Sequence, residues 1–299
     1  MSKSGKWSLR AASFVLMIFC GAVLCFGQQG PEDPIVQAAI KTIRTQARLP
    51  QDTDIKFLEK RESQLTGFYA VKLLLTLTDQ EIPIIVYVDK KGEKVILGSL
   101  VIKGENVSRK EAGMARRRKV DPAQLETEKS PFRGSPGAKI KIVEFSNFEC
   151  PFCQQSWMKT KEWMEKHPAD IHYVFKHYSS GPQGEISDFS EMAAAAQEIG
   201  NEAFWLVHDF FFSNEGQVLT KGERGQVKER IEQILKEKGY DVEVFRSAMD
   251  TGKAKKRVEE DTAKGKKIKV HSTPTTFVNG DVFVGAISDL VFQQYLGKN

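Results

Sequence analysis

The stretch FSNFECPFCQQ, residues 145–155, holds two cysteines separated by two residues, with a proline directly after the first. Cys150 and Cys153 have the types and spacing for three kinds of chemistry. They suit half of a metal site, a structural disulfide, or a redox pair that exchanges disulfides. The number of other cysteines and the elements around the pair distinguish these uses.

Residues 1–27 have the pattern of a secretory signal peptide. Lys3, Lys6 and Arg10 precede a short apolar run, AASFVLMIFCGAVLCF, which ends just before Gly27. The run is short for a membrane span, which needs about 20 apolar residues, and cleavage after Gly27 fits the rule of small residues at the cut. The alternative is an uncleaved anchor, which would leave the same domain outside the membrane. We therefore expect a periplasmic or secreted protein.

Cleavage changes the cysteine count, because two of the four cysteines lie in the signal peptide and only Cys150 and Cys153 remain. A disulfide between them closes a very short loop, so it removes little entropy from the unfolded chain and stabilises poorly. A zinc site needs four ligands. Of the five histidines, only His172 and His177 have a suitable spacing, and they lie on or beside a predicted strand. We expect no metal, and no cofactor beyond the redox-active disulfide itself.

The charge balance favours no particular partner. The formal net charge of +5 falls to +2 (5 − 3) when the three cations of the signal peptide leave. The basic run RRRK at 116–119 is interpreted as part of a solvated linker, so we expect no nucleic-acid partner.

Residues 31–108 predict a small α+β domain in which one helix packs on an antiparallel sheet. Apolar positions at helical spacing are followed by strand-like segments, and Gly92 marks a hairpin turn between the last two. The expected elements are a helix at 34–47 and strands at 54–62, 67–78, 82–89 and 94–102.

Residues 109–137 are charged and loop-like and predict a linker. A second domain follows at 138–299. Its expected elements are a strand at 139–147, a helix at 150–167, a strand at 171–178, helical segments at 187–200, 201–212, 224–239 and 241–266, a hairpin at 272–286 and a helix at 288–297. Its aromatic stripes, such as Phe210 to Phe212 and Trp205, are interpreted as core.

A Cys-x-x-Cys at the start of a helix favours the redox pair. The first turn of a helix offers unpaired backbone N–H groups and the positive end of the helix dipole, which stabilise a thiolate. Pro151 suits the first helical position, where its missing N–H costs nothing. Cys150 is then the exposed nucleophile, and Cys153, one turn further in, resolves the mixed disulfide.

Two segments, IVEFSNFECPFC and STPTTFVNG, resemble the thioredoxin superfamily, and within it the DsbA-like thiol–disulfide oxidoreductases. The resemblance covers about 138–299 and implies an α/β, thioredoxin-like domain with a helical insertion at about 185–266. It also implies a cis proline at Pro274 and a backbone at Thr273 that pairs with an extended client segment.

The resemblance further implies that Glu144, an acid in an apolar strand, lies beneath the pair and moves the proton of Cys153; a strand-end acid that reaches solvent is the alternative. Glu149, beside the nucleophile, is expected to be exposed and to oppose thiolate formation. Phe152 is a predicted client contact and a departure from the pattern, because strong oxidants of the family have histidine there. This departure leaves oxidase, isomerase and reductase open.

The predicted function is therefore an exported enzyme that exchanges disulfides with client proteins and a membrane or periplasmic redox partner. The added N-terminal domain is similar in layout to the domains through which DsbC and DsbG dimerise. Two of its strands are apolar on both faces, and one helix does not cover both, which favours a homodimer through this domain. The alternative use of the domain is to dock a client or a partner as a monomer. The alternative from another class is a redox-inactive thioredoxin-fold binding module, either a chaperone or a metallochaperone.

Overall fold

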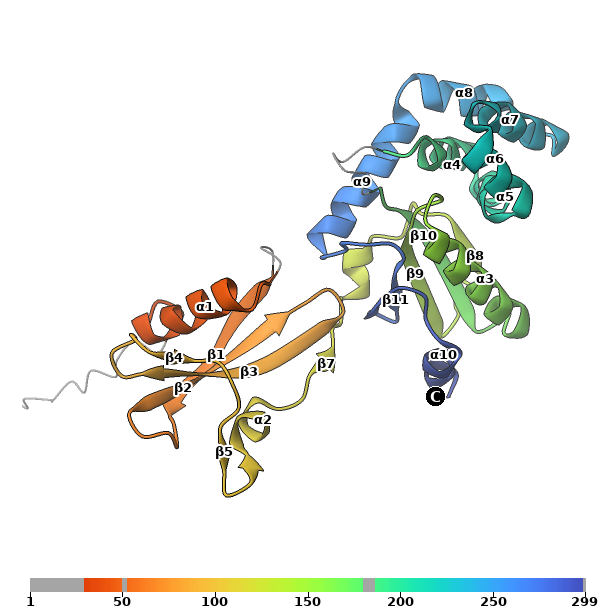
Figure 1. Cartoon of the computed structure of the whole chain (residues 1–299). Helices are drawn as coiled ribbons and strands as arrows, with labels where there is room; N and C mark the ends of the chain where they lie inside the picture. Colours follow the sequence, from red (N-terminus) through yellow and green to blue (C-terminus); the bar gives the residue numbers. More distant parts are fainter. Residues whose placement is uncertain (1–29, 50–52, 180–185, 298–299) are drawn as a thin grey trace, which may run out of the picture.

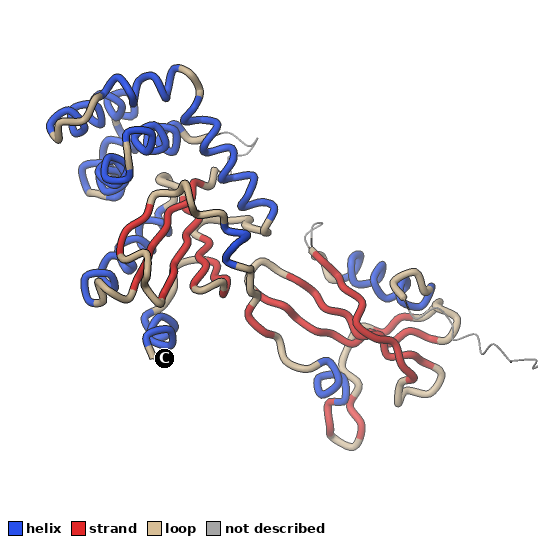
Figure 2. The backbone as a smooth tube through the Cα atoms, turned by 180° about the vertical axis from the view of Figure 1, so that it is seen from behind, coloured by secondary structure: helices blue, strands red, loops and turns tan. Residues whose placement is uncertain are grey.

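The computed structural model describes residues 30–49, 53–179 and 186–297. The predicted signal peptide lies outside these ranges. The described chain forms two lobes, each built on its own five-stranded sheet (Figures 1 and 2). The predicted fold class is confirmed: a thioredoxin-like domain with a helical insertion, and a small N-terminal helix-on-sheet domain. Within the described ranges, every helix is too short or too polar to cross a lipid bilayer.

The N-terminal lobe contains one antiparallel sheet in the order β1-β2-β3-β4, with β7 beside the start of β3. Its elements are α1 (Pro34–Gln46), β1 (Asp54–Glu62), β2 (Phe68–Thr76), β3 (Gln80–Asp89), β4 (Val95–Ile96), β5 (Val101–Ile102), β6 (Glu105–Asn106), α2 (Val107–Ala112) and β7 (Arg116–Arg117).

Helix α1 covers one face of this sheet because its apolar side chains recur at helical spacing. Asp33 caps the helix and forms an ion pair with Lys60 of β1, which ties the helix to the sheet. The short helix α2 covers part of the other face. The buried cluster under α1 contains Ile35, Val36, Ala39 and Ile43 of the helix and Val71, Leu73, Leu75, Val86 and Val88 of the sheet.

The single strand expected at 94–102 is wrong. Of the residues in this segment, only those of β4 pair with β3, and β5 belongs to a separate hairpin with β6. The hairpin turns at Lys103 and Gly104, which both have positive φ (50° and 83°), the geometry of a tight two-residue turn. This turn pairs Val101–Ile102 with the residues that follow instead of with β3.

The segment 109–137, expected to be a loop-like linker, contains several short elements. After α2 and β7 come a 3-10 turn, η1 (Pro122–Leu125), and the strand β8 (Phe132–Gly134). Strand β8 pairs with β10 and therefore belongs to the sheet of the C-terminal lobe. Three residues with a proline before them give too little periodicity to be recognised as a strand in the sequence.

The C-terminal lobe has a mixed sheet in the order β12-β11-β9-β10-β8. Strands β9 and β10 are parallel, with α3 as the crossover between them, and β11 runs antiparallel to β9. The elements are β9 (Ile140–Ser146), α3 (Pro151–Lys166), β10 (Ile171–His177), β11 (Thr275–Val278), β12 (Asp281–Val284) and α10 (Asp289–Leu296).

A helical insertion between β10 and β11 packs over the end of the sheet near the start of α3 (Figure 1). Phe211 and Trp205 are buried, as predicted. Helix α6 was not predicted: its segment, NEGQVLTKG, has glycines at two positions and few apolar residues. The helices are α4 (Asp188–Ile199), α5 (Asn201–Phe212), α6 (Asn214–Gly222), η2 (Arg224–Gln226), α7 (Val227–Glu237), α8 (Val242–Asp250) and α9 (Lys253–Lys267).

Candidate functional site

The two cysteines lie at the N-terminus of α3, where β9 ends. Cys150 is the N-cap residue, with an extended backbone, and Pro151 occupies the first helical position. Cys150 is partly exposed and Cys153 is fully buried; both are thiols in this structure. Cys153 Sγ accepts a hydrogen bond from the backbone N–H of Asn147 at 3.4 Å. Only one of the two sulfurs therefore faces solvent.

The surroundings shift the pKa values of the two cysteines in opposite directions. The pKa of Cys150 is lowered to about 5, mainly by the hydrogen bond from Cys153. Thr273 and the backbone N–H groups of the first helical turn also lower it, whereas partial burial opposes the shift. Burial, the hydrogen bond to Cys150 and the nearby charge of Glu144 raise the pKa of Cys153. At neutral pH Cys150 is therefore the thiol that ionises, and Cys153 stays protonated.

Glu144 lies in the middle of the sheet, on the face that α3 covers. Its side chain is fully buried, and burial raises its pKa to about 7, against hydrogen bonds that favour the carboxylate. Ser156 of α3 donates to Glu144 Oε2 at 2.6 Å, and Thr276 of β11 donates to the same oxygen at 3.5 Å. The strand-end alternative, in which this acid reaches solvent, is wrong because every neighbouring element covers it.

Tyr173 is the buried neighbour of Glu144 on β10. Burial and the charge of Glu144 raise the pKa of Tyr173, so its phenol stays protonated through the neutral range. Ser156, Thr276 and Tyr173 were not found from the sequence. They approach Glu144 from three different elements, and no local motif joins them.

The loop before β11 lies against the exposed sulfur. The Thr273–Pro274 peptide bond is cis, and Cys150 Sγ is 3.3 Å from the carbonyl oxygen of Thr273, to which the thiol donates. Pro274 is buried, whereas Thr273 is half-buried. Phe152 is 60 % exposed beside Cys150. The structure thus brings together all six residues singled out in the sequence: Cys150, Cys153, Glu144, Thr273, Pro274 and Phe152.

Glu149 has a partner that the sequence did not reveal. Arg224 of η2 donates from Nη1 to Glu149 Oε1 at 2.8 Å, and its guanidinium lies 4.4 Å from the ring centroid of Phe189. The negative charge expected to oppose the Cys150 thiolate is therefore partly neutralised by the insertion. These two residues are 75 positions apart in the chain, so no spacing rule connects them.

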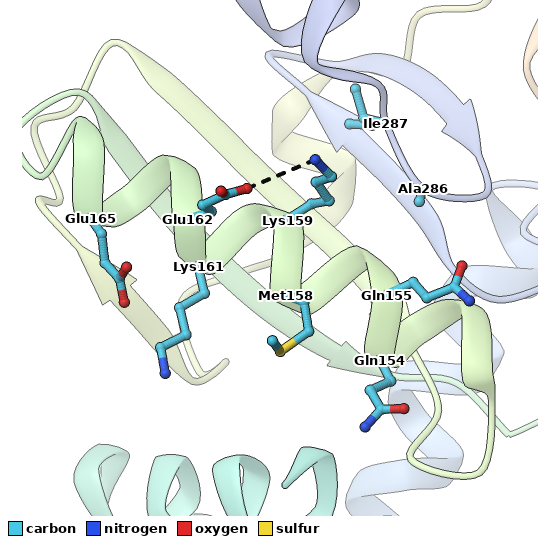
Figure 3. Close-up of a pocket in the computed structure, with 9 residues that line it drawn as sticks. All are labelled: Gln154, Gln155, Met158, Lys159, Lys161, Glu162, Glu165, Ala286 and Ile287. Carbon is cyan, nitrogen blue, oxygen red and sulfur yellow. Dashed lines mark ion pairs between the residues drawn. The ribbon is translucent and has the colours of Figure 1, made fainter. Parts of the chain in front are cut away.

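A surface hollow of about 760 Å³ follows α3 away from the cysteines (Figure 3). Gln155 and Lys159 project from α3 toward Ala286 and Ile287, in the loop after β12, and Met158 projects from another side of the helix. Met158 is 58 % exposed.

Among the residues that the structure describes, the histidines do not gather into a metal site. His177 and His208 are fully buried, and burial lowers the pKa of each to about 4, so both rings are neutral at pH 7. Across the three described ranges, no group of three or more histidine, cysteine or acidic side chains lies close enough together to hold a metal ion.

Residues 126–298 match the family described as thioredoxin. The match covers more than half of the chain, and the chain belongs to this family. The predicted resemblance to the thioredoxin superfamily is thereby confirmed. The match begins at 126, inside the segment expected to be a linker, in agreement with the place of β8 in the C-terminal sheet.

Similar proteins include membrane transporters and thiol-handling proteins. A Na(+)/H(+) antiporter NhaA 1 of Salinispora arenicola is 28% identical over 158 residues, 52% of this chain but only 22% of the antiporter. The chain thus spans about a fifth of that relative. The probable disulfide bond formation protein D of Bacillus cereus is 27% identical over 161 residues, 50% of this chain and 69% of that protein. The solved structure of the thiol-disulfide exchange protein alpha-DsbA2 from Wolbachia pipientis has a TM-score of 0.47 at 18% identity, covering 59% of this chain and 90% of its own.

Proposed function

We propose that this protein is an exported thiol–disulfide oxidoreductase that exchanges disulfides with client proteins through Cys150 and Cys153. One observation carries the proposal. Cys150, at the N-terminus of α3, has a pKa lowered to about 5 and lies 3.3 Å from the Thr273 carbonyl oxygen, while Cys153 is buried directly behind it. The similarity to a probable disulfide bond formation protein supports the same activity.

In the reducing direction, the Cys150 thiolate attacks a client disulfide. The client S–S bond breaks, a Cys150–client disulfide forms, and one client thiolate leaves. Cys153 then gives its proton to the Glu144 carboxylate and attacks Cys150 Sγ. The client leaves with both sulfurs reduced, and the protein holds the Cys150–Cys153 disulfide. The same steps in reverse oxidise a client.

Glu144 suits the proton transfer because its pKa of about 7 lies close to the working pH. Thr273 supplies backbone groups for an extended client segment, and Pro274 shapes that loop. The exposed ring of Phe152 offers an apolar contact beside the nucleophile. The couple itself is the only redox group that this mechanism requires. The reduction potential of this couple decides between oxidase, isomerase and reductase. For a two-electron couple, a change of about 30 mV in the potential corresponds to about 1.4 kcal/mol in free energy.

Trapping of mixed disulfides tests the proposal. Cys153→Ser blocks resolution, so client proteins are expected to accumulate on Cys150, and the matched Cys150→Ser variant is expected to trap none. A couple that neither cycles with dithiothreitol nor forms mixed disulfides would instead establish the redox-inactive binding module.

Export and self-association are the other parts of the proposal. The intact mass of the protein recovered from its host tests cleavage after Gly27. The N-terminal lobe exposes Leu97, directly after β4, and Val101 of the β5–β6 hairpin, which are 40 % and 57 % exposed. These apolar side chains support a homodimer through this lobe. Sedimentation at micromolar concentration is expected to show a dimer that Val101→Glu weakens. A monomer at every concentration would leave the lobe as a docking surface for a client or a redox partner.

A further inference from the structure

The segment from Arg116 to Val120 is hydrogen-bonded to both sheets. Strand β7 pairs with Gln80 and Glu81 at the start of β3. The next residues pair with β12: Val282 N–H donates to the Arg118 carbonyl oxygen at 3.0 Å, and Val120 N–H donates to the Gly280 carbonyl oxygen at 2.9 Å. The segment that joins the two lobes is therefore hydrogen-bonded through its backbone to both of them.

Arg118 is the residue that both lobes share. Its backbone N–H donates to the Asp79 carbonyl oxygen of the N-terminal lobe at 2.8 Å. Its side chain is nearly buried and donates to the carbonyl oxygens of Thr78 and of Ile268, on opposite sides of the junction. An ion pair between Lys269 and Asp54 at 3.2 Å adds a second tie. The β2–β3 turn is therefore held beside the chain that leaves α9.

This arrangement leaves a hollow of about 410 Å³ between the lobes. The described residues that line it include Thr76, Leu77 and Thr78 of the β2–β3 turn, and His271 and Val284 of the C-terminal lobe. Leu49, Leu77, Val284 and the threonine methyl groups supply its apolar walls, and the charged residues Asp79 and Lys269 also line it. The volume lies at the lower end of the range for ligand pockets, about 300–1,000 Å³.

The hollow adjoins the loop that faces the nucleophile. His271 precedes Thr273 by two residues, and Val284 pairs with Thr275, directly after the cis proline. A client segment that extends along Thr273 places its side chains alternately on its two faces, and residues two apart are about 6.6 Å apart. In one direction along the loop, the client residue two positions from the cysteine therefore lies beside His271, a residue that lines the hollow.

We infer that the junction hollow receives an apolar side chain of the client segment, so that the N-terminal lobe contributes to client selection. The inference rests on the proposed disulfide exchange. The occupant is an extended polypeptide with a small apolar residue, such as valine, two positions from its reactive cysteine. The walls that recognise this residue come from both lobes, and the hydrogen bonds of Arg118 hold those walls at a fixed separation.

Peptide thiols test the inference on the oxidised protein. The peptide thiolate attacks Cys150 Sγ, the Cys150–Cys153 bond breaks, and Cys153 leaves as the thiolate, which changes the tryptophan fluorescence of the protein. Two peptides with a single cysteine are compared. One has valine and the other has glycine at the second position before and the second position after the cysteine, and the two are otherwise identical. Partial burial of valine is expected to make its peptide react about tenfold faster. Glutathione is measured in parallel.

Thr78→Trp fills the hollow from the N-terminal lobe and is expected to bring the valine-to-glycine rate ratio close to one. Thr45→Trp, on the exposed side of α1, is the matched control and keeps the ratio of the unmodified protein. Equal rates for both peptides in the unmodified protein overturn the inference, as does an unchanged ratio in Thr78→Trp. Failure of the unmodified protein to react with glutathione would instead refute the proposed disulfide exchange.

Discussion

Replacement of Glu144 by glutamine is expected to stabilise the protein in a way that depends on pH. The pKa of Glu144 is raised from its usual value of 4.5 to about 7, mainly by burial. Between these two values the unfolded chain has lost the proton and the folded chain still holds it. The unfolded state thus binds fewer protons, and the free energy of unfolding falls as pH rises.

The size of this effect follows from the two pKa values. Each tenfold difference in proton affinity is worth about 1.4 kcal/mol, so an ionised Glu144 costs the fold about 3 kcal/mol above pH 7. A glutamine side chain at this position carries no charge at any pH and can still accept the hydrogen bond from Ser156. The advantage of Glu144→Gln is therefore expected to be small at pH 4, to grow between pH 4.5 and 7, and then to level off.

Urea unfolding of both proteins, at half-unit steps from pH 4 to 8, measures this difference. Both proteins keep the same cysteines, so the difference reports the ionisation of Glu144 together with its coupling to the Cys150 thiolate. Resolution of a Cys150 mixed disulfide should also slow in Glu144→Gln, because Cys153 loses its proton acceptor. A stability difference that stays constant from pH 5 to 8 would refute the claim that Glu144 titrates near neutral pH.

Three further outcomes are expected. With a pKa of about 5, Cys150 is almost entirely thiolate at pH 7, so iodoacetamide should modify it about 100-fold faster than Cys153, as mass spectrometry of the peptides would show. Arg224→Gln leaves the charge of Glu149 without its ion pair and should raise the pKa of Cys150 by a few tenths. Thiolate absorbance at 240 nm measures this pKa, and adding Glu149→Gln should reverse the increase. Gly216→Ala places a methyl group 1.9 Å from a carbonyl oxygen of α5 and should cost about 1–3 kcal/mol in thermal or urea unfolding, and an unchanged midpoint would contradict this packing.

The fold could be predicted wherever local pattern decides the structure. The segment CPFCQQSW begins a helix because a proline follows the capping residue, and IVEFS is predicted as a strand because its apolar residues are β-branched or aromatic. The strand over 94–102 failed for a non-local reason. Its residues are apolar enough for one strand, but the turn at Lys103 and Gly104 pairs its second half elsewhere.

The candidate site was predictable from local spacing and from the segment STPTTFVNG, which carries the family resemblance. The spacing of Cys150 and Cys153 and the position of Glu144 are local, and the structure brings these residues together. The partners that set their chemistry come from distant segments: Thr276 is 132 residues from Glu144, and Arg224 is 75 residues from Glu149. A single sequence carries no signal for such pairs. The basic run at 116–119 was interpreted as solvated, yet Arg118 is nearly buried, because two carbonyl oxygens from different lobes accept its hydrogen bonds.

The backbone pairing of Arg118–Val120 with β12 also affects how the folded protein behaves at high concentration. Strand β12 is the last strand of its sheet, and an open edge of this kind is a template on which another chain can add a strand and begin aggregation. The junction segment occupies that edge with its own hydrogen bonds. Among the strands that the structure describes, β1 is then the longest edge strand, and most of its side chains are charged. In the proposed exchange with client proteins, these two edges would therefore be poor templates for an unfolded, strand-forming client.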